Sequence, residues 1–151
     1  MRDINHEDMD RTLKIDDLLC FSLYSANHAL TRLYRPLLAP LGLTYPQYLV
    51  LVALWEQDEQ KVRDLGKRLD LETNTLTPLL KRMESAGYLT RRRNPEDERS
   101  LIVSLTDKGQ GLQAEAQEIS TCVIEAMGGD LNELIELRDR VNALRARLDS
   151  A

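Results

Sequence analysis

The sequence predicts a mainly α-helical fold, with a winged helix-turn-helix as its α+β part. Two short helical segments, Lys61–Leu69 and Thr73–Ala86, are followed at once by two strand-like segments, Tyr88–Arg93 and Ser100–Leu105. Apolar residues recur at helical spacing on both sides of this block. The 151 residues are 42% hydrophobic and 30% charged, which is typical of one globular domain with a proper core.

Two helices are predicted before the helix-turn-helix. The first begins near Asp16 and keeps a helical apolar period until it is ended or bent by three residues, Pro36, Pro40 and Gly42. The second, Tyr45–Trp55, carries Pro46 in its first turn and is apolar nearly all round. That pattern predicts a buried central helix.

Two further helices are predicted after the wing. The fifth opens at Thr106 or Asp107, with Gly109 and Gly111 weakening its first turns, and Gly128-Gly129 ends it. A sixth helix carries apolar residues from Leu131 to Leu148. The terminal helices are too long and too apolar to be buried on so small a core. We therefore expect an obligate homodimer, with 1–43 and 106–151 forming the dimerisation region and 44–105 the winged helix.

Basic residues gather in the predicted helix-turn-helix. Nine Lys and Arg residues face four Asp and Glu residues between Lys61 and Arg93, whereas the whole chain has 20 against 25. A local basic surface on an acidic protein is typical of contact with nucleic-acid phosphates. The net charge of −5 argues against a protein that coats DNA by charge alone.

The predicted DNA contacts lie on the second helix of the motif and on the wing. Short polar groups suit base edges and phosphates, and basic groups suit phosphates. Arg99, near the wing tip, is expected to enter a minor groove, with Asp97 holding its guanidinium. The set is Thr73, Asn74, Thr75, Thr77, Lys81, Arg82, Arg91, Arg93, Asp97 and Arg99. The alternative is a solvated face balanced by the acidic residues of the wing.

The cysteines and histidines predict no metal site and no cofactor. Cys20 and Cys122 are 102 positions apart, so the chain has no CxxC motif, and His6 and His28 are isolated. We found neither a membrane-length apolar run nor a signal-peptide core, which favours a cytoplasmic protein with reduced thiols and no membrane partner.

The run LGKRLDLETNTLTPLLKRMESAGYLTRRRNPEDERSLIVSLTDKG resembles the winged-helix segment of the MarR family of repressors. The resemblance extends over nearly the whole chain. Cys20 followed by LYRPLLAPLGLTYPQYLVLVALWE is similar to the organic hydroperoxide-sensing, OhrR-type branch of that family. The resemblance implies that Cys20 is the peroxide sensor and that Tyr34 and Tyr45 hydrogen-bond its sulfur from the partner subunit. It further implies that Cys122 forms an intersubunit disulfide with Cys20.

Cys20 also has a physical case of its own. It is expected about one turn inside the first helix, where the helix dipole favours a negative sulfur, although the capping residues Asp16 and Asp17 oppose it. A nearby apolar surface would favour organic hydroperoxides. The alternative is that Cys20 is a small buried hydrophobic residue and that Cys122 is a core or interface residue of the fifth helix, between Ile119 and Val123.

The sequence thus predicts a dimeric repressor that binds a palindromic operator when reduced and leaves it after organic hydroperoxide oxidises Cys20. Two other interpretations remain. One is a MarR-type regulator released by a small aromatic ligand, with no redox role for Cys20. The other is a thiol peroxidase, although the chain lacks the βαβ pattern of thioredoxin-like chemistry.

Overall fold

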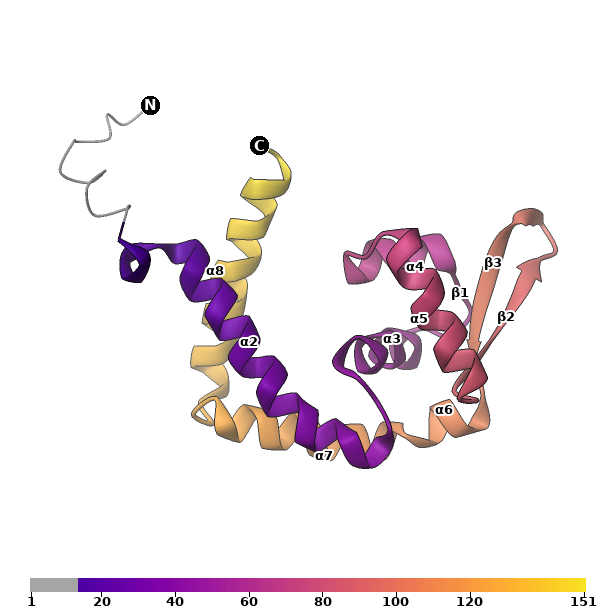
Figure 1. Cartoon of the computed structure of the whole chain (residues 1–151), viewed down its shortest axis with the longest axis horizontal. Coiled ribbons are helices and arrows are strands. Elements are labelled where there is room, and N and C mark those ends of the chain that lie inside the picture. Colours follow the sequence, from indigo (N-terminus) through magenta and orange to yellow (C-terminus); the bar gives the residue numbers. More distant parts are fainter. Residues whose placement is uncertain (1–13) are drawn as a thin grey trace. The chain divides into compact units, whose positions relative to one another are not determined.

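The computed structural model describes residues 14–151. The chain divides into two compact units after Tyr45, so the described residues are 14–45 of the first unit and 46–151 of the second. His6, one of the two isolated histidines, lies outside the described residues. The first unit contains a 3-10 turn, η1 (Ile15–Asp17), the long helix α2 (Leu19–Leu38) and a second 3-10 turn, η2 (Ala39–Leu41) (Figure 1).

The second unit is the winged helix together with the C-terminal helices. Its elements are α3 (Tyr45–Glu56), β1 (Gln60–Lys61), α4 (Val62–Leu69), α5 (Thr73–Ser85), β2 (Leu89–Asn94), β3 (Asp97–Leu105), α6 (Asp107–Gly111), α7 (Gln113–Ala126) and α8 (Leu131–Asp149). The three strands form an antiparallel sheet in the order β1-β3-β2. The mainly α fold with a small β-sheet is confirmed.

The core of this unit forms where α3, α4 and α5 meet the sheet. The buried face of α3 includes Val50, Leu51 and Leu54, each 0% exposed, so the predicted central helix is confirmed. Leu65 of α4 and Leu76 of α5 are equally buried. Full burial of each such side chain contributes about 1.5–3 kcal/mol. This packing fixes α5 against the sheet and leaves its opposite face to solvent.

The start of the first helix differs from the prediction. Residues Ile15–Asp17 form a separate 3-10 turn, Leu18 is extended, and α2 begins only at Leu19. Asp16 and Asp17 therefore do not cap α2. At the other end, Pro36 lies within the helix, and Gly42 ends the following turn at a φ of 69°.

The predicted fifth helix is two helices. α6 ends at Gly111, Leu112 lies between them, and α7 starts at Gln113. Thr106 caps α6 as expected, because its side chain accepts a hydrogen bond from the backbone of Gly109. Gly128 and Gly129, at φ angles of 105° and 76°, end α7 as predicted, because glycine adopts left-handed backbone without strain.

The terminal helices leave large apolar side chains exposed. The exposed residues are Leu19, Phe21, Leu23 and Tyr24 on α2, and Leu131, Ile135, Leu137, Val141 and Leu148 on α8. Tyr24 is 60% exposed. Of the helices in residues 14–151, none is by itself long and apolar enough to cross a membrane.

Candidate nucleic-acid interface and thiol site

The turn between α4 and α5 sets the position of α5. Asp70 ends α4 in a left-handed conformation, with φ of 55°. The backbone N–H of Leu71 then donates to the carbonyl of Gly66 at 2.9 Å. A Cβ on Gly66 would lie 2.8 Å from the carbonyl oxygen of Leu71, so a side chain there would force the turn open. Glycine at this position lets the two helices come close.

The residues predicted to read DNA are accessible on α5. Thr73, Asn74 and Thr75 form its first turn and are exposed, whereas Thr77 is partly buried. Lys81 and Arg82 are exposed farther along the helix. Leu76, Leu79, Leu80 and Met83 form the opposite, buried face. The helix therefore presents a polar and basic surface while its apolar side is held by the core.

The wing tip is closed by two short polar side chains. Asn94 Oδ1 accepts from the backbone N–H of Glu96 at 3.1 Å, and Asn94 is only 4% exposed. Asp97 Oδ1 accepts from the backbone N–H of Arg99, also at 3.1 Å. This bond orders the backbone of the wing tip, and the contact of Asp97 with the Arg99 guanidinium stays a prediction. Arg99 itself is exposed.

Arg91, one of the predicted DNA contacts, is paired within the chain. Its guanidinium lies 3.1 Å from Glu84 Oε1, and its backbone N–H donates to Glu84 Oε2 at 2.7 Å. The Arg91 side chain is only 17% exposed. The hydrogen bonds from the backbone and side chain of Arg91 lower the pKa of Glu84. Arg91 therefore joins β2 to α5, and its contact with DNA stays a prediction, whereas Arg93 is exposed.

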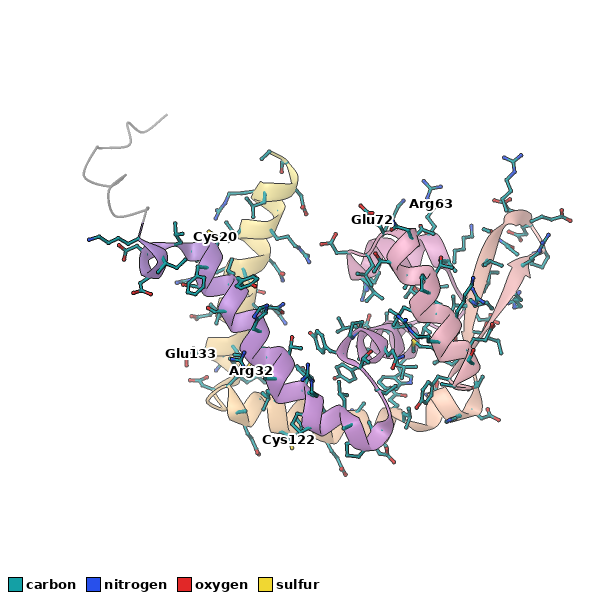
Figure 2. The ribbon with its side chains drawn as sticks, in the orientation of Figure 1. Cys20, Arg32, Arg63, Glu72, Cys122 and Glu133 are labelled. Atoms are coloured by element: carbon teal, nitrogen blue, oxygen red, sulfur yellow. The ribbon has the colours of Figure 1, made fainter. Side chains whose placement is uncertain are left out.

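Two basic residues of α4 were missing from the predicted set. Arg63 and Lys67 are exposed and line a groove with Asp70, Glu72 and Thr73, at the start of α5. Figure 2 shows Arg63 and Glu72 at this end of the helix pair. Their spacing of four residues places Arg63 and Lys67 on one face of α4, and this spacing in the sequence could have identified them as a basic pair.

The two thiols lie at different kinds of position. Cys20 is the second residue of α2, and Cys122 lies in α7 (Figure 2). Both are exposed and neither forms a disulfide within the chain. The alternative that they are buried in the core of their own chain is therefore wrong. Cys122 sits between the buried Ile119 and Val123 along α7, with its own side chain outside that core.

Tyr34 and Tyr45 form a pair. Their ring centroids are 4.8 Å apart with the planes tilted by 44°. Both side chains are partly buried, and burial raises the pKa of the Tyr45 phenol above its usual value of 10. The Tyr45 hydroxyl therefore stays protonated to higher pH than an exposed tyrosine.

An apolar groove of about 240 Å³ lies between α3 and α7. Tyr48, Val52 and Trp55 line one side, and Ala116 and Ser120 the other. Within residues 14–151, no group of three or more His, Cys, Asp or Glu side chains is placed to hold a metal ion.

Comparison with known proteins gives the family. A model of the transcriptional regulators SarA/Rot matches residues 32–116. The chain is 45% identical to the HTH-type transcriptional regulator TtmR of Methylorubrum extorquens, over 92% of the chain and 71% of TtmR. It is 44% identical to the organic hydroperoxide resistance transcriptional regulator of Bacillus subtilis, over 81% of the chain and 85% of that protein.

Solved structures agree with the fold. One match is the structure of reduced AbfR bound to DNA, and AbfR is a protein of Staphylococcus epidermidis. It matches with a TM-score of 0.81 at 35% identity, over 97% of this chain and 98% of AbfR. A disulfide form of AbfR matches with a TM-score of 0.63 at 37% identity, covering 97% of each chain. These relatives are regulators, so the thiol peroxidase interpretation falls. The chain therefore belongs to the SarA/Rot family of transcriptional regulators, together with relatives such as the organic hydroperoxide resistance transcriptional regulator.

Proposed function

We propose that the chain is a homodimeric repressor that binds a palindromic operator when Cys20 is reduced and releases it after oxidation by an organic hydroperoxide. The observation that carries the redox part is the position of Cys20, an exposed thiol in the first turn of α2. The first N–H groups of a helix have no partner within it, and the helix dipole favours a negative sulfur there.

DNA binding rests on the exposed polar turn and basic residues of α5 together with the wing. Thr73, Asn74, Thr75 and Thr77 would face base edges, and Lys81 and Arg82 would face phosphates. Arg93 and Arg99 would contact the DNA phosphates or enter a minor groove. Reduced AbfR, the relative solved with DNA, supports this arrangement.

A dimer would cover the apolar faces of α2 and α8. Monomers in solution rarely leave so many large apolar side chains exposed along two helices. A two-fold axis would place two α5 helices in successive major grooves, about 34 Å apart, on a palindromic site. The regions 1–43 and 106–151 remain the predicted dimerisation surface.

The chemistry balances with the peroxide as oxidant. The Cys20 thiolate attacks the O–O bond, an S–O bond forms, and the alkoxide takes a proton and leaves as an alcohol. The Cys122 thiolate of the partner subunit then attacks the sulfenic sulfur, an S–S bond forms and water leaves. The two thiols lose two electrons, which the peroxide accepts. The Tyr34 and Tyr45 hydroxyls would stabilise the thiolate as donors. The disulfide form of AbfR supports a covalent oxidised state.

The test is a gel shift with reduced and cumene hydroperoxide-treated protein, compared with Cys20→Ser and Cys122→Ser. We expect wild type to release DNA and to run as a covalent dimer without reductant. Cys20→Ser should bind DNA and ignore the peroxide, and its continued release would remove Cys20 as the sensor. Full release by Cys122→Ser would remove the disulfide, but not the sensor, from the mechanism.

A second candidate function is release by a small aromatic ligand. The apolar groove beside Trp55 favours it, because ligand pockets are typically apolar with a few polar groups at the rim. Release of Cys20→Ser from DNA by benzoate would support this interpretation. Peroxide-dependent release that needs Cys20, with no response to benzoate, would exclude it for that ligand.

A further inference from the structure

The segment Thr106–Gly109 touches the end of the recognition helix α5, the base of the hairpin and α3. We propose that it is a clasp that ties α7, the helix of Cys122, to the C-terminal end of α5, and that Lys108 is its main positioning residue. The clasp is defined as Thr106, Lys108 and Gly109. This inference rests on the proposed redox release of DNA, because it assigns the path by which a change at α7 reaches the DNA-reading helix.

Lys108 closes the end of α5. Its Nζ donates to the carbonyl of Ala86, the C-cap residue of α5, at 2.8 Å. The same ammonium lies 4.8 Å from the centroid of the Tyr88 ring. The last carbonyls of a helix lack partners within it and carry the negative end of its dipole, so a cation there stabilises the helix end. Lys108 thus holds α5 from outside the helix.

Thr106 fastens the adjacent residues. Its hydroxyl donates to the carbonyl of Gly87 at 2.5 Å and accepts from the N–H of Gly109 at 3.2 Å. Its backbone N–H donates to the carbonyl of Tyr88 at 3.1 Å. Three consecutive carbonyls after α5, from Ala86 to Tyr88, therefore have partners in the clasp. The end of α5 cannot move far from α6 without breaking these bonds together.

Gly109 brings the clasp against two other elements. A Cβ at this position would lie only 2.1 Å from the Tyr88 carbonyl oxygen, so backbone packs directly on backbone. The Gly109 carbonyl accepts from Trp55 Nε1 of α3 at 3.0 Å. Figure 1 shows α6 at the foot of α5 and of the hairpin. The clasp is therefore held by Trp55 of α3 as well as by the backbone of Tyr88.

The connection from the clasp to α7 is short. Leu112 alone separates α6 from α7, and Cys122 lies within α7. A shift of α7 on disulfide formation would therefore pull α6 and, through Lys108 and Thr106, the end of α5. Packed elements with two discrete arrangements transmit such shifts over several turns of helix.

The test compares Lys108→Met with Lys108→Arg in the full-length protein. Methionine keeps an unbranched chain against the Tyr88 ring but has no donor for Ala86, whereas arginine keeps the charge and the donor. Operator Kd is measured by fluorescence anisotropy for the reduced and the cumene hydroperoxide-oxidised forms. A non-reducing gel confirms that each variant forms the covalent dimer.

We expect Lys108→Met to form the disulfide and to bind the operator when reduced within about threefold of wild type. Its ratio of oxidised to reduced Kd should fall about fivefold or more below that of wild type, while Lys108→Arg should restore the ratio. A merely structural lysine would weaken both forms equally and leave the ratio unchanged, and that result overturns the inference. If wild type itself keeps the operator after oxidation, the proposed function fails instead, so the two failures are distinguishable.

Discussion

Gly109 and Gly111, two residues apart in α6, should respond in opposite ways to alanine. At Gly109 the new Cβ would meet the Tyr88 carbonyl oxygen at 2.1 Å, the Tyr88 carbonyl carbon at 3.1 Å and Leu105 Cδ2 at 3.2 Å. Non-bonded heavy atoms normally lie about 3.5 Å apart, so backbone must move by more than 1 Å on one side. At Gly111 nothing lies within 4 Å of the Cβ.

The magnitudes follow from these two environments. Overpacking costs about 1–3 kcal/mol, and displacing the Tyr88 carbonyl also weakens its hydrogen bond from Thr106, at about 1 kcal/mol. Alanine regains about 1 kcal/mol of helix propensity. We expect Gly109→Ala to lower the free energy of unfolding by about 2 kcal/mol, and Gly111→Ala to raise it by up to about 1 kcal/mol.

Thermal unfolding by circular dichroism, at one fixed protein concentration, measures both changes. The expected shifts are about 4–8 °C downward for Gly109→Ala and up to about 4 °C upward for Gly111→Ala. Equal Tm values for the two variants, or a Gly109→Ala variant as stable as wild type, would refute the close packing of α6 on the hairpin base.

Four other predictions concern the DNA interface, the Glu84–Arg91 ion pair and the sensor. Arg99→Ala should reduce the slope of log K against log salt for operator binding by about 1. Arg92→Ala is the control and should change this slope less, because the Arg92 side chain already pairs with Glu59 at 3.2 Å. Equal slopes for the two variants would count against the wing contact. Glu84→Gln should cost about 1 kcal/mol in urea unfolding at neutral pH; since the folded pKa of Glu84 is lowered, this difference should fade as pH drops below 4.5, and a pH-independent difference would argue against the ion pair. Tyr45→Phe should slow oxidation of Cys20 in a stopped-flow thiol assay without changing operator affinity of the reduced form, and an unchanged rate would remove the hydroxyl from the site. Because the folded pKa of Tyr45 is raised, wild type should also lose stability relative to Tyr45→Phe as pH rises above 10.

The helix-turn-helix was readable from the sequence because its signals are local. The predicted helix Lys61–Leu69 exceeds α4 by one residue, and the predicted strands differ from β2 and β3 by a few residues at their ends. Apolar spacing and the glycines at 128 and 129 each act on neighbouring backbone. Strand β1 was missed because two residues cannot display a period, and its pairing partner Val103 lies far along the chain.

Residue type, spacing and the concentration of positive charge predicted the fold class and the candidate DNA surface, and the family resemblance selected Cys20 as the sensor. Tertiary structure alone decided that Arg91 is held by Glu84, that Tyr34 and Tyr45 meet, and that α6 grips the end of α5. The physical reason is that helix and turn signals come from bonds between residues a few positions apart. Ion pairs, ring contacts and side-chain caps join residues whose separation in the chain carries no information about their distance in space.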